Sequence, residues 1–306
     1  MHSILNLIRY KNLLLIILTQ VLIKYVLFSS FGVSIALTLF EFMLLVLATI
    51  CIAAAGNVIN DVYDVETDLI NKPHKVIVGK SISEKSALNL FIILNIIGVG
   101  IGFYLSNSIG RSGFTALFII ISVLLYIYAT YLKQTVLIGN IIISVLVAMS
   151  IIIVGLFDLL PAITPQNQLT QLAIFKIVFN YAVFAFMINL LREIIKDIED
   201  IEGDSKTEIK TLPVVIGKKR ATILVFILSL IPLFAVTYYV VTYLYKQQIA
   251  VVYFLVFIIA PLLYFTIKSI SAKSNRELHQ LSNILKGVML FGVLSLLLYS
   301  LMLNNA

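Results

Sequence analysis

Long apolar stretches separated by short polar segments run along the whole chain. Each is about as long as the roughly 20 residues that an α-helix needs to cross the hydrocarbon core of a bilayer. The stretches lie near residues 12–33, 36–58, 87–107, 113–132, 136–160, 172–192, 221–244, 248–270 and 284–303. The pattern predicts an all-α, polytopic membrane protein with nine transmembrane helices. It also predicts a single domain over residues 1–306, with no soluble domain beside it.

The basic residues predict how the chain lies across the membrane. Of 306 residues only 12% are charged, yet the net charge is +7. Most Lys and Arg residues fall in the N-terminal segment and in every second loop, and such loops stay on the cytoplasmic side. We therefore expect a cell-membrane protein with its N-terminus inside and its C-terminus outside. The charge excess then reflects topology and attraction to anionic membrane lipids, and a nucleic-acid partner is not expected.

Most of the 15 acidic residues lie in two short segments, 61–68 and 193–208. Each segment has a helical stripe with spacings of 4, 3 and 4 residues, which places its members on one face of a helix. The first stripe is Asn57, Asp61, Asp64 and Asp68, and the second is Glu193, Asp197, Asp200 and Asp204. The glutamates off the stripes, Glu66, Glu199 and Glu202, are expected to face solvent or to pair with lysines.

The two acidic segments are predicted to lie on the same face of the membrane. Four predicted spans separate them, so both emerge on the cytoplasmic side, where they can meet. Similar sequences also follow them, Val-Ile-Val-Gly-Lys at 76–80 and Val-Val-Ile-Gly-Lys at 214–218. This repetition indicates an internal duplication, with a first half near 36–80 and a second near 172–218.

The density of carboxylates indicates a Mg²⁺ site. Mg²⁺ prefers hard oxygen ligands, takes one or two carboxylates, and shares the rest of its shell with water and substrate phosphates. A diphosphate bound between the stripes would suit this chemistry, and nearby cations could contact its oxygens. Those cations are Lys72, Lys75, Lys133, Arg192 and Lys196. Either stripe alone could be a solvated helix end, but two matched stripes favour a functional site.

Two motifs resemble those of the UbiA superfamily of intramembrane prenyltransferases. That family carries N-D-x-x-D-x-x-x-D after its second helix and D-x-x-D-x-x-x-D after its sixth. Here the first motif is read from Asn60 to Asp68 and the second from Asp197 to Asp204. The segment from Leu132 to Asn140 is similar to the family's basic turn between its fourth and fifth helices. After the first motif the chain departs from the arginine-proline-rich loop of relatives and reads Lys-Val-Ile-Val-Gly, so the phosphate contact of that loop differs.

The resemblance implies a bundle with a central apolar chamber and a Mg²⁺-dependent transfer of a prenyl group from a polyprenyl diphosphate. It implies that the aspartates hold the metal and act in catalysis: Asp61, Asp64, Asp68, Asp197, Asp200 and Asp204. It further implies that Asn57, Asn60 and the five cations bind substrate.

The acceptor is open at this point. The second motif with its flanks, 192–204, is similar to the family branch that makes digeranylgeranylglyceryl phosphate, which favours a lipid acceptor and a geranylgeranyl donor. An aromatic acceptor of quinone biosynthesis is the alternative, since aromatic-acceptor relatives share parts of this segment. A cation-dependent transporter is a third hypothesis, disfavoured because transporters place carboxylates near the middle of the bilayer.

Overall fold

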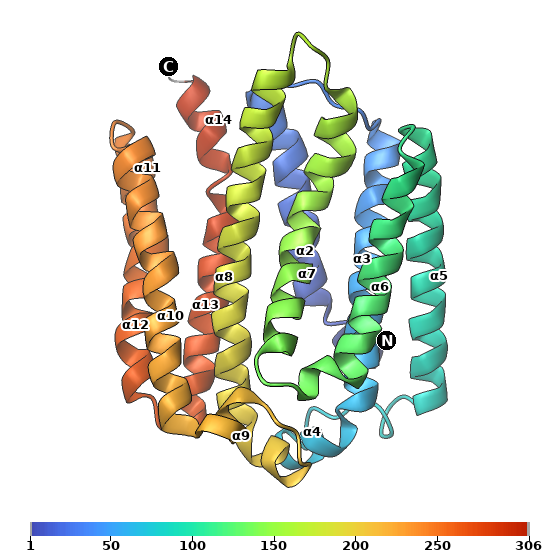
Figure 1. Ribbon diagram of the computed structural model, residues 1–306, viewed down its shortest axis with the longest axis vertical. Helices are drawn as coiled ribbons and strands as arrows, with labels where there is room; N and C mark the ends of the chain where they lie inside the picture. The colour runs from blue at the N-terminus through green and yellow to red at the C-terminus, as the bar shows by residue number, and fades with distance from the viewer. Residues whose placement is uncertain (1, 305–306) are drawn as a thin grey trace.

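The computed structural model describes residues 2–304, and the regular structure of these residues is helical (Figure 1). Nine segments within them are long and apolar enough to cross a membrane, which confirms the predicted number. The first five spans are α2 (Tyr10–Leu22, continued by the π-helical turn Ile23–Phe28), α3 (Leu39–Tyr63), α5 (Glu84–Ser108), α6 (Thr115–Thr130) and α7 (Ile138–Val154). The last four are α8 (Gln168–Lys206), α10 (Lys218–Tyr239), α11 with α12 (Gln248–Phe254 and Ala260–Ser271) and α13 with α14 (Asn275–Leu294 and Leu297–Asn304).

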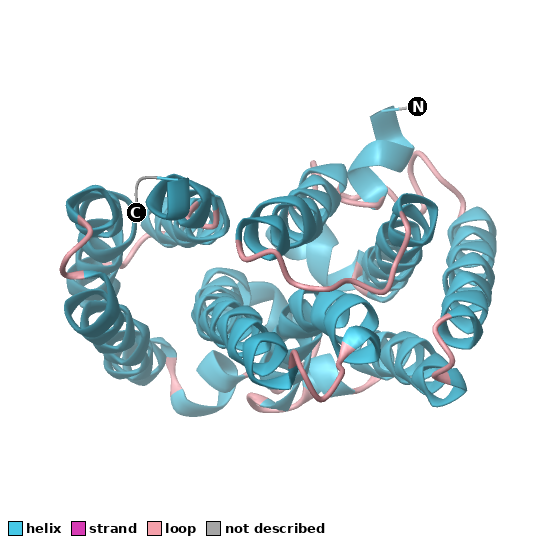
Figure 2. Ribbon diagram, turned by 90° about the horizontal axis from the view of Figure 1, so that it is seen from above, coloured by secondary structure: helices cyan, strands magenta, loops and turns pink. Residues whose placement is uncertain are grey.

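Two short helices lie at the end of the bundle that is lowest in Figure 1, α4 (Val65–Asn71) and α9 (Leu212–Ile216). A third, α1 (His2–Leu7), precedes α2. Seen end on, the spanning helices stand side by side in one bundle (Figure 2). α4 packs against α8, whereas α9 contacts both α8 and α10. The segments that follow α3 and α8 therefore lie together on one face.

α8 joins the two halves of the apolar core. Its first part contributes Ile174, Val178 and Ala182 to a core shared with α2, α3 and α7. Its later part contributes Ile188 and Ile195 to a second core with α10, α12 and α13. Because both cores hold α8 along its length, its C-terminal turns project rigidly from the apolar region. This 39-residue helix extends well past the predicted span of 172–192.

Local signals set where the helices next to the site begin and end. Thr38 and Glu41 form a reciprocal capping box that starts α3, and Ser83 caps α5. α3 ends at Tyr63, and Asp64 (ψ −2°) separates it from α4. The chain therefore bends inside the first acidic motif.

A buried ion pair fixes the opposite end of the bundle. Lys24 Nζ lies 2.8 Å from Asp158 Oδ2, and both side chains are almost fully buried. The Leu37 amide donates to Asp158 Oδ1 at 2.9 Å, while Lys24 donates to the Leu37 carbonyl at 2.8 Å. A buried charge without a partner costs several kcal/mol, so the pair holds the linker between the first two spans against the end of α7.

Candidate active site

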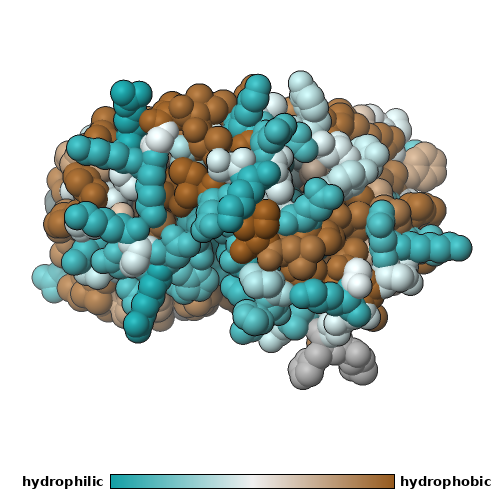
Figure 3. Space-filling model, turned by 90° about the horizontal axis from the view of Figure 1, so that it is seen from below, coloured by the Kyte–Doolittle hydropathy of each residue, from teal (hydrophilic) through white to brown (hydrophobic). Residues whose placement is uncertain are grey.

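The two acidic segments meet at the lower face of the bundle, as the even number of intervening spans predicts. Asn71, at the end of α4, donates to the Asp200 carbonyl and accepts from the Gly203 amide, both at 2.9 Å. A Cβ at Gly203 would lie 2.3 Å from Asn71 Nδ2, so the contact requires glycine at this position. Hydrophilic side chains spread across this face (Figure 3).

The carboxylates of the first motif are paired with cations from other parts of the chain. Asp61 lies 2.7 Å from Arg9, which precedes α2. Asp64 forms an ion pair with Lys133, in the turn between α6 and α7, and accepts from Asn60 Nδ2 at 2.7 Å. Burial disfavours the charged forms of Arg9 and Lys133, but the neighbouring aspartates outweigh it and raise the pKa of both cations. Both therefore stay protonated at neutral pH.

Asp68 differs from the other two aspartates of this motif. Burial raises the pKa of Asp68, the charge of Asp64 adds to the effect, and Lys133 and Lys72 oppose it. Among the described residues, no hydrogen bond or ion pair to its side chain is found. Its charge is thus the least compensated of the motif.

The second motif is held mostly by neutral donors. Asn140 on α7 donates to Asp197 Oδ2 at 2.7 Å, and Thr211 donates to Asp204 Oδ2 at 3.0 Å. Asp200 is the exception, because Lys72 lies 2.6 Å from its carboxylate. This ion pair links the segment after α4 directly to α8.

The predicted substrate-binding residues fall into three groups. Lys72, Lys133 and Asn60 contact aspartates of the motifs. Arg192 and Lys196 share Glu193, at 3.2 and 2.8 Å, one to two turns deeper along α8. The other two have no contact with an aspartate among the described residues: Asn57 donates to the Ile8 carbonyl at 3.0 Å, and exposed Lys75 lines an open pocket together with Lys72 and Asp200.

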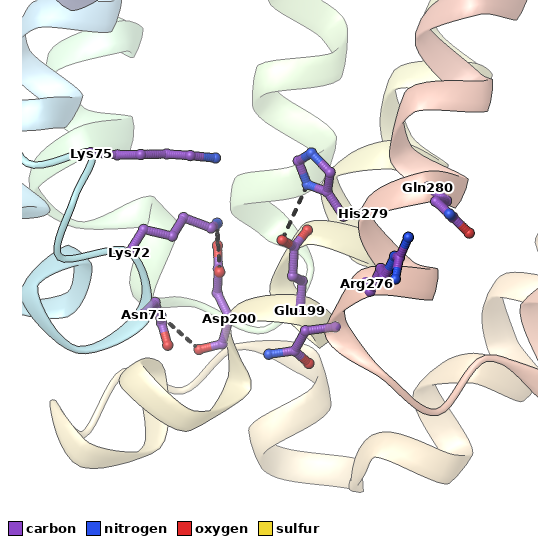
Figure 4. A pocket seen from close by; sticks show the side chains of 9 residues that line it. Asn71, Lys72, Lys75, Glu199, Asp200, Arg276, His279 and Gln280 are labelled. Atoms are coloured by element: carbon purple, nitrogen blue, oxygen red, sulfur yellow. Dashed lines mark hydrogen bonds and ion pairs between the residues drawn. The ribbon is translucent and has the colours of Figure 1, made fainter.

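That pocket lies between the segment after α4, the end of α8 and the start of α13 (Figure 4). Its volume is about 480 Å³, and Lys72, Asp200, Arg276 and Gln280 help to line it. Glu199 also lines it and lies 3.3 Å from His279. The expectation that Glu199 faces solvent or pairs with a lysine is therefore wrong, because α13 packs over that side of α8.

For the other off-stripe glutamates the expectation is confirmed. Glu66 is exposed, and Glu202 pairs with Lys206 four residues along α8, at 2.8 Å.

Sequence reasoning missed several partners of the aspartates. The sequence marks Arg9 only as one of the basic residues of the N-terminal segment, and it does not predict the contacts of Asn71, Asn140 and Thr211. A helical stripe shows which residues share a face but not which residues the fold places opposite it. The closest indication of such a partner is Asn140, because it lies in the 132–140 segment that is similar to the family's basic turn.

The donor set fits a metal that is shared with substrate phosphates. Within residues 2–304, no three acidic, His or Cys side chains converge on a point that could hold a metal by themselves. Mg²⁺ does not require this, since it commonly takes one or two carboxylates and completes its shell with water and phosphate oxygens. The Oδ1 atom of Asn60 is buried beside Asp64 and accepts no hydrogen bond among the described residues, which leaves an oxygen donor free. The residues present are therefore compatible with Mg²⁺.

Comparison with known proteins identifies the family. A family model described as the UbiA prenyltransferase family matches residues 22–291. A digeranylgeranylglyceryl phosphate synthase from Methanosphaera stadtmanae is 35% identical over 257 residues, which cover 82% of this chain and 86% of the relative. The protein of the same name from Methanobrevibacter smithii is 32% identical over 261 residues, covering 83% and 86%.

Solved structures show the same fold. The apo structure of a UbiA homologue from Aeropyrum pernix K1 has a TM-score of 0.65 at 13% identity, with 97% of each chain covered. A UbiA homologue from Archaeoglobus fulgidus, bound to GPP and Mg²⁺, has a TM-score of 0.55 at 18% identity, covering 96% of this chain and 99% of the homologue. The fold, the family match and the two relatives agree with the resemblance of the motifs, and the chain belongs to the UbiA prenyltransferase family as a multi-pass membrane enzyme.

Proposed function

We propose that this enzyme transfers a geranylgeranyl group from its diphosphate to the free hydroxyl of geranylgeranylglyceryl phosphate, with Mg²⁺ as cofactor. The observation that carries the proposal is the meeting of the two aspartate motifs, with Lys72 and Lys133 reaching from neighbouring segments into the carboxylates. The choice of acceptor is supported by the two relatives named digeranylgeranylglyceryl phosphate synthase, which match most of the chain.

Asp61, Asp64 and Asp68 would hold Mg²⁺ on one side, and Asp197, Asp200 and Asp204 on the other. When bound, Mg²⁺ supplies positive charge that stabilises the leaving diphosphate. The cations that contact the carboxylates in this structure, Arg9, Lys72 and Lys133, are then free to bind diphosphate oxygens. The same side chains thus serve two partners in turn.

In the reaction the allylic C–O bond breaks and its electron pair leaves with the diphosphate. The acceptor hydroxyl then bonds to the allylic carbon and loses its proton. Water has to be kept from the allylic cation, because it would form the free alcohol instead. The segments around α4 and α9, which cover the ends of α3 and α8, are placed for this role (Figure 1).

The site is proposed to face the cytoplasm. Most Lys and Arg residues of the chain belong to the N-terminal segment and to the loops on the face of α4 and α9. Loops rich in basic residues remain on the cytoplasmic side, which puts the N-terminus inside. A diphosphate donor from the cytoplasm would reach the site directly.

The test is product formation by purified protein in detergent. Geranylgeranyl diphosphate is supplied with and without Mg²⁺, and geranylgeranylglyceryl phosphate is offered beside an aromatic acid acceptor. We expect Mg²⁺-dependent release of diphosphate and product on the glyceryl phosphate. Product on the aromatic acid alone would overturn the acceptor but keep the reaction class. Absence of Mg²⁺-dependent release with prenyl diphosphates of any length would instead favour binding or transport.

A further inference from the structure

Helix α13 carries a polar stripe that the aspartate chemistry does not use. Arg276, His279, Asn283 and Lys286 are spaced by 3, 4 and 3 residues, so they share one face of the helix. The contact between His279 and Glu199 turns this face toward α8. Arg276 and His279 line the open pocket of Figure 4, and the stripe continues from there along α13, which packs against α8.

Lys286 is the deepest member of this stripe. It lies seven residues beyond His279, about 10 Å farther along the axis at the rise of an α-helix. Its leading charge interactions are with other cations, first Arg192 and Lys196 and then Arg9 and Lys75. No hydrogen bond or ion pair to Lys286 is found in the described part of the chain. The charges of cations from three other segments therefore act on Lys286, and α8, which carries two of these cations, packs against α13.

Two carboxylates near this cluster already have cationic partners, whereas Asp197, next to Lys196, accepts a hydrogen bond from the neutral Asn140. Glu193 is shared by Arg192 and Lys196, and Asp61 is taken by Arg9. The buried Nε of Arg192 has no acceptor among the described residues. Excess positive charge inside a membrane protein is costly unless an anion offsets it. A phosphate monoester, with a charge of about −1.5 to −2, would do so.

Lys286 is accessible, because its side chain is exposed. Because Arg192 and Lys196 lie one to two turns deeper along α8 than Asp200, an anion bound there would be displaced from the Lys72–Asp200 contact between the motifs. The cluster and the aspartates can thus hold two different anionic groups.

We propose that Lys286, Arg192 and Lys196 form a subsite for the phosphate monoester of the acceptor lipid. Arg276 and His279 form its entrance from the cytoplasmic pocket. This inference rests on the proposed function and extends it, since it assigns recognition of the acceptor's phosphate to α13 and α8. The diphosphate of the donor remains with Mg²⁺ and the aspartates. Holding the two groups separately would leave the acceptor hydroxyl free to approach the allylic carbon.

The test compares two acceptors that differ only in the phosphate, geranylgeranylglyceryl phosphate and geranylgeranylglycerol. In Lys286→Gln we expect the KM of the phosphorylated acceptor to rise roughly tenfold or more, the loss typical of one charge-assisted hydrogen bond. The KM of the dephosphorylated acceptor and that of the donor should stay nearly unchanged, as should kcat. Lys286→Arg keeps the positive charge and should restore most of the preference for the phosphate.

The matched control is Lys219→Gln, which removes an exposed lysine at the start of α10 and should change neither KM. An unchanged donor KM also shows that Lys286→Gln has folded. If Lys286→Gln raises the donor KM instead, the cations serve the diphosphate and the subsite is wrong. If the wild type uses the glyceryl phosphate and Lys286→Gln does not alter its KM, the subsite is wrong while the proposed function stands. If the wild type does not use the glyceryl phosphate at all, both the subsite and the proposed function are wrong.

Discussion

The two acidic segments carry carboxylates at the same spacing, yet the chain folds differently around them. In the first, the helix breaks at Asp64 and restarts as α4. In the second, α8 continues without interruption through Asp197, Asp200 and Asp204 to Lys206. The first motif therefore bends around the site, whereas the second is a straight helical edge beside it. Equal spacing in the sequence does not produce equal geometry.

The segments also differ in how their charge is compensated. Arg9 and Lys133, from distant parts of the chain, neutralise Asp61 and Asp64. Asp197 and Asp204 instead accept hydrogen bonds from Asn140 and Thr211, which carry no charge. In the first motif, the charges of Asp61 and Asp64 are thus paired within the protein before any metal or substrate binds. In the second motif, Asp197 and Asp204 form no ion pair among the described residues, and only Asp200 is paired with a cation.

The loops that follow the motifs support the proposed internal duplication. Gly79 (φ +80°) and Gly217 (φ +85°) occupy the same place in the repeated five-residue sequences, and both adopt a backbone that favours glycine. Gly217 directly caps α10, whereas four residues separate Gly79 from α5. We propose that the two halves share an origin and that the first has since acquired the extra turn.

The largest expected effect is on catalysis. Asp64→Asn and Asp197→Asn should each lower Mg²⁺-dependent turnover roughly a hundred- to a thousandfold, since each removes a carboxylate proposed to hold the Mg²⁺ that stabilises the leaving diphosphate. Glu66→Gln, at an exposed position in the first motif but off its stripe, should be mild. Diphosphate release in detergent measures all three. A loss in Glu66→Gln equal to that of the other two variants would show that the stripes do not define the site.

Asp64→Asn and Asp197→Asn should differ in their effect on the free energy of unfolding. Asp64→Asn leaves the largely buried Lys133 without its counter-ion, which should cost about 1–3 kcal/mol. Asp197→Asn keeps an oxygen for Asn140 and removes a partly buried charge that has no ion-pair partner among the described residues, so it should not destabilise the protein. The free energy of unfolding of both variants, measured in detergent without Mg²⁺, shows which of them is less stable. Equal destabilisation would mean that the two motifs are compensated alike.

A smaller effect is expected where the two segments touch. Gly203→Ala places a Cβ against the Asn71 side chain and should separate α4 from α8, with a cost of about 1–3 kcal/mol. Gly100→Ala in α5 is the matched control, because its Cβ meets no atom within 4 Å. The midpoint of thermal unfolding should fall only in the first variant. A change of equal size in both would place the cause in the helix backbone and not in the contact.

Hydropathy was sufficient to predict the spans, because a helix in lipid needs a continuous apolar length and little else. The stripes were equally visible, since residues three and four apart must share a helical face. The second stripe also predicted that the helix continues past its apolar span to Asp204, as α8 does. The break at Asp64 could not be predicted, because it accompanies the contacts of α4 with α8. The same holds for Arg9, Asn140 and Lys286. Their roles arise from elements that are distant in sequence and meet only in the folded bundle.

The smallest effect concerns the last aspartate of each stripe. Asp204 receives a hydrogen bond from Thr211, whereas Asp68 has no such donor among the described residues, and burial followed by the charge of Asp64 raises the pKa of Asp68. Because its pKa is raised in the folded protein, ionised Asp68 lowers the free energy of unfolding near pH 7. This cost disappears as the pH falls below about 4, because the carboxyl is then protonated in both the folded and the unfolded chain. Without Mg²⁺, Asp68→Asn should therefore raise the unfolding midpoint at pH 7 by about 2 °C and have little effect at low pH. If Asp68→Asn instead lowers the midpoint, the charge of Asp68 is compensated in the folded protein.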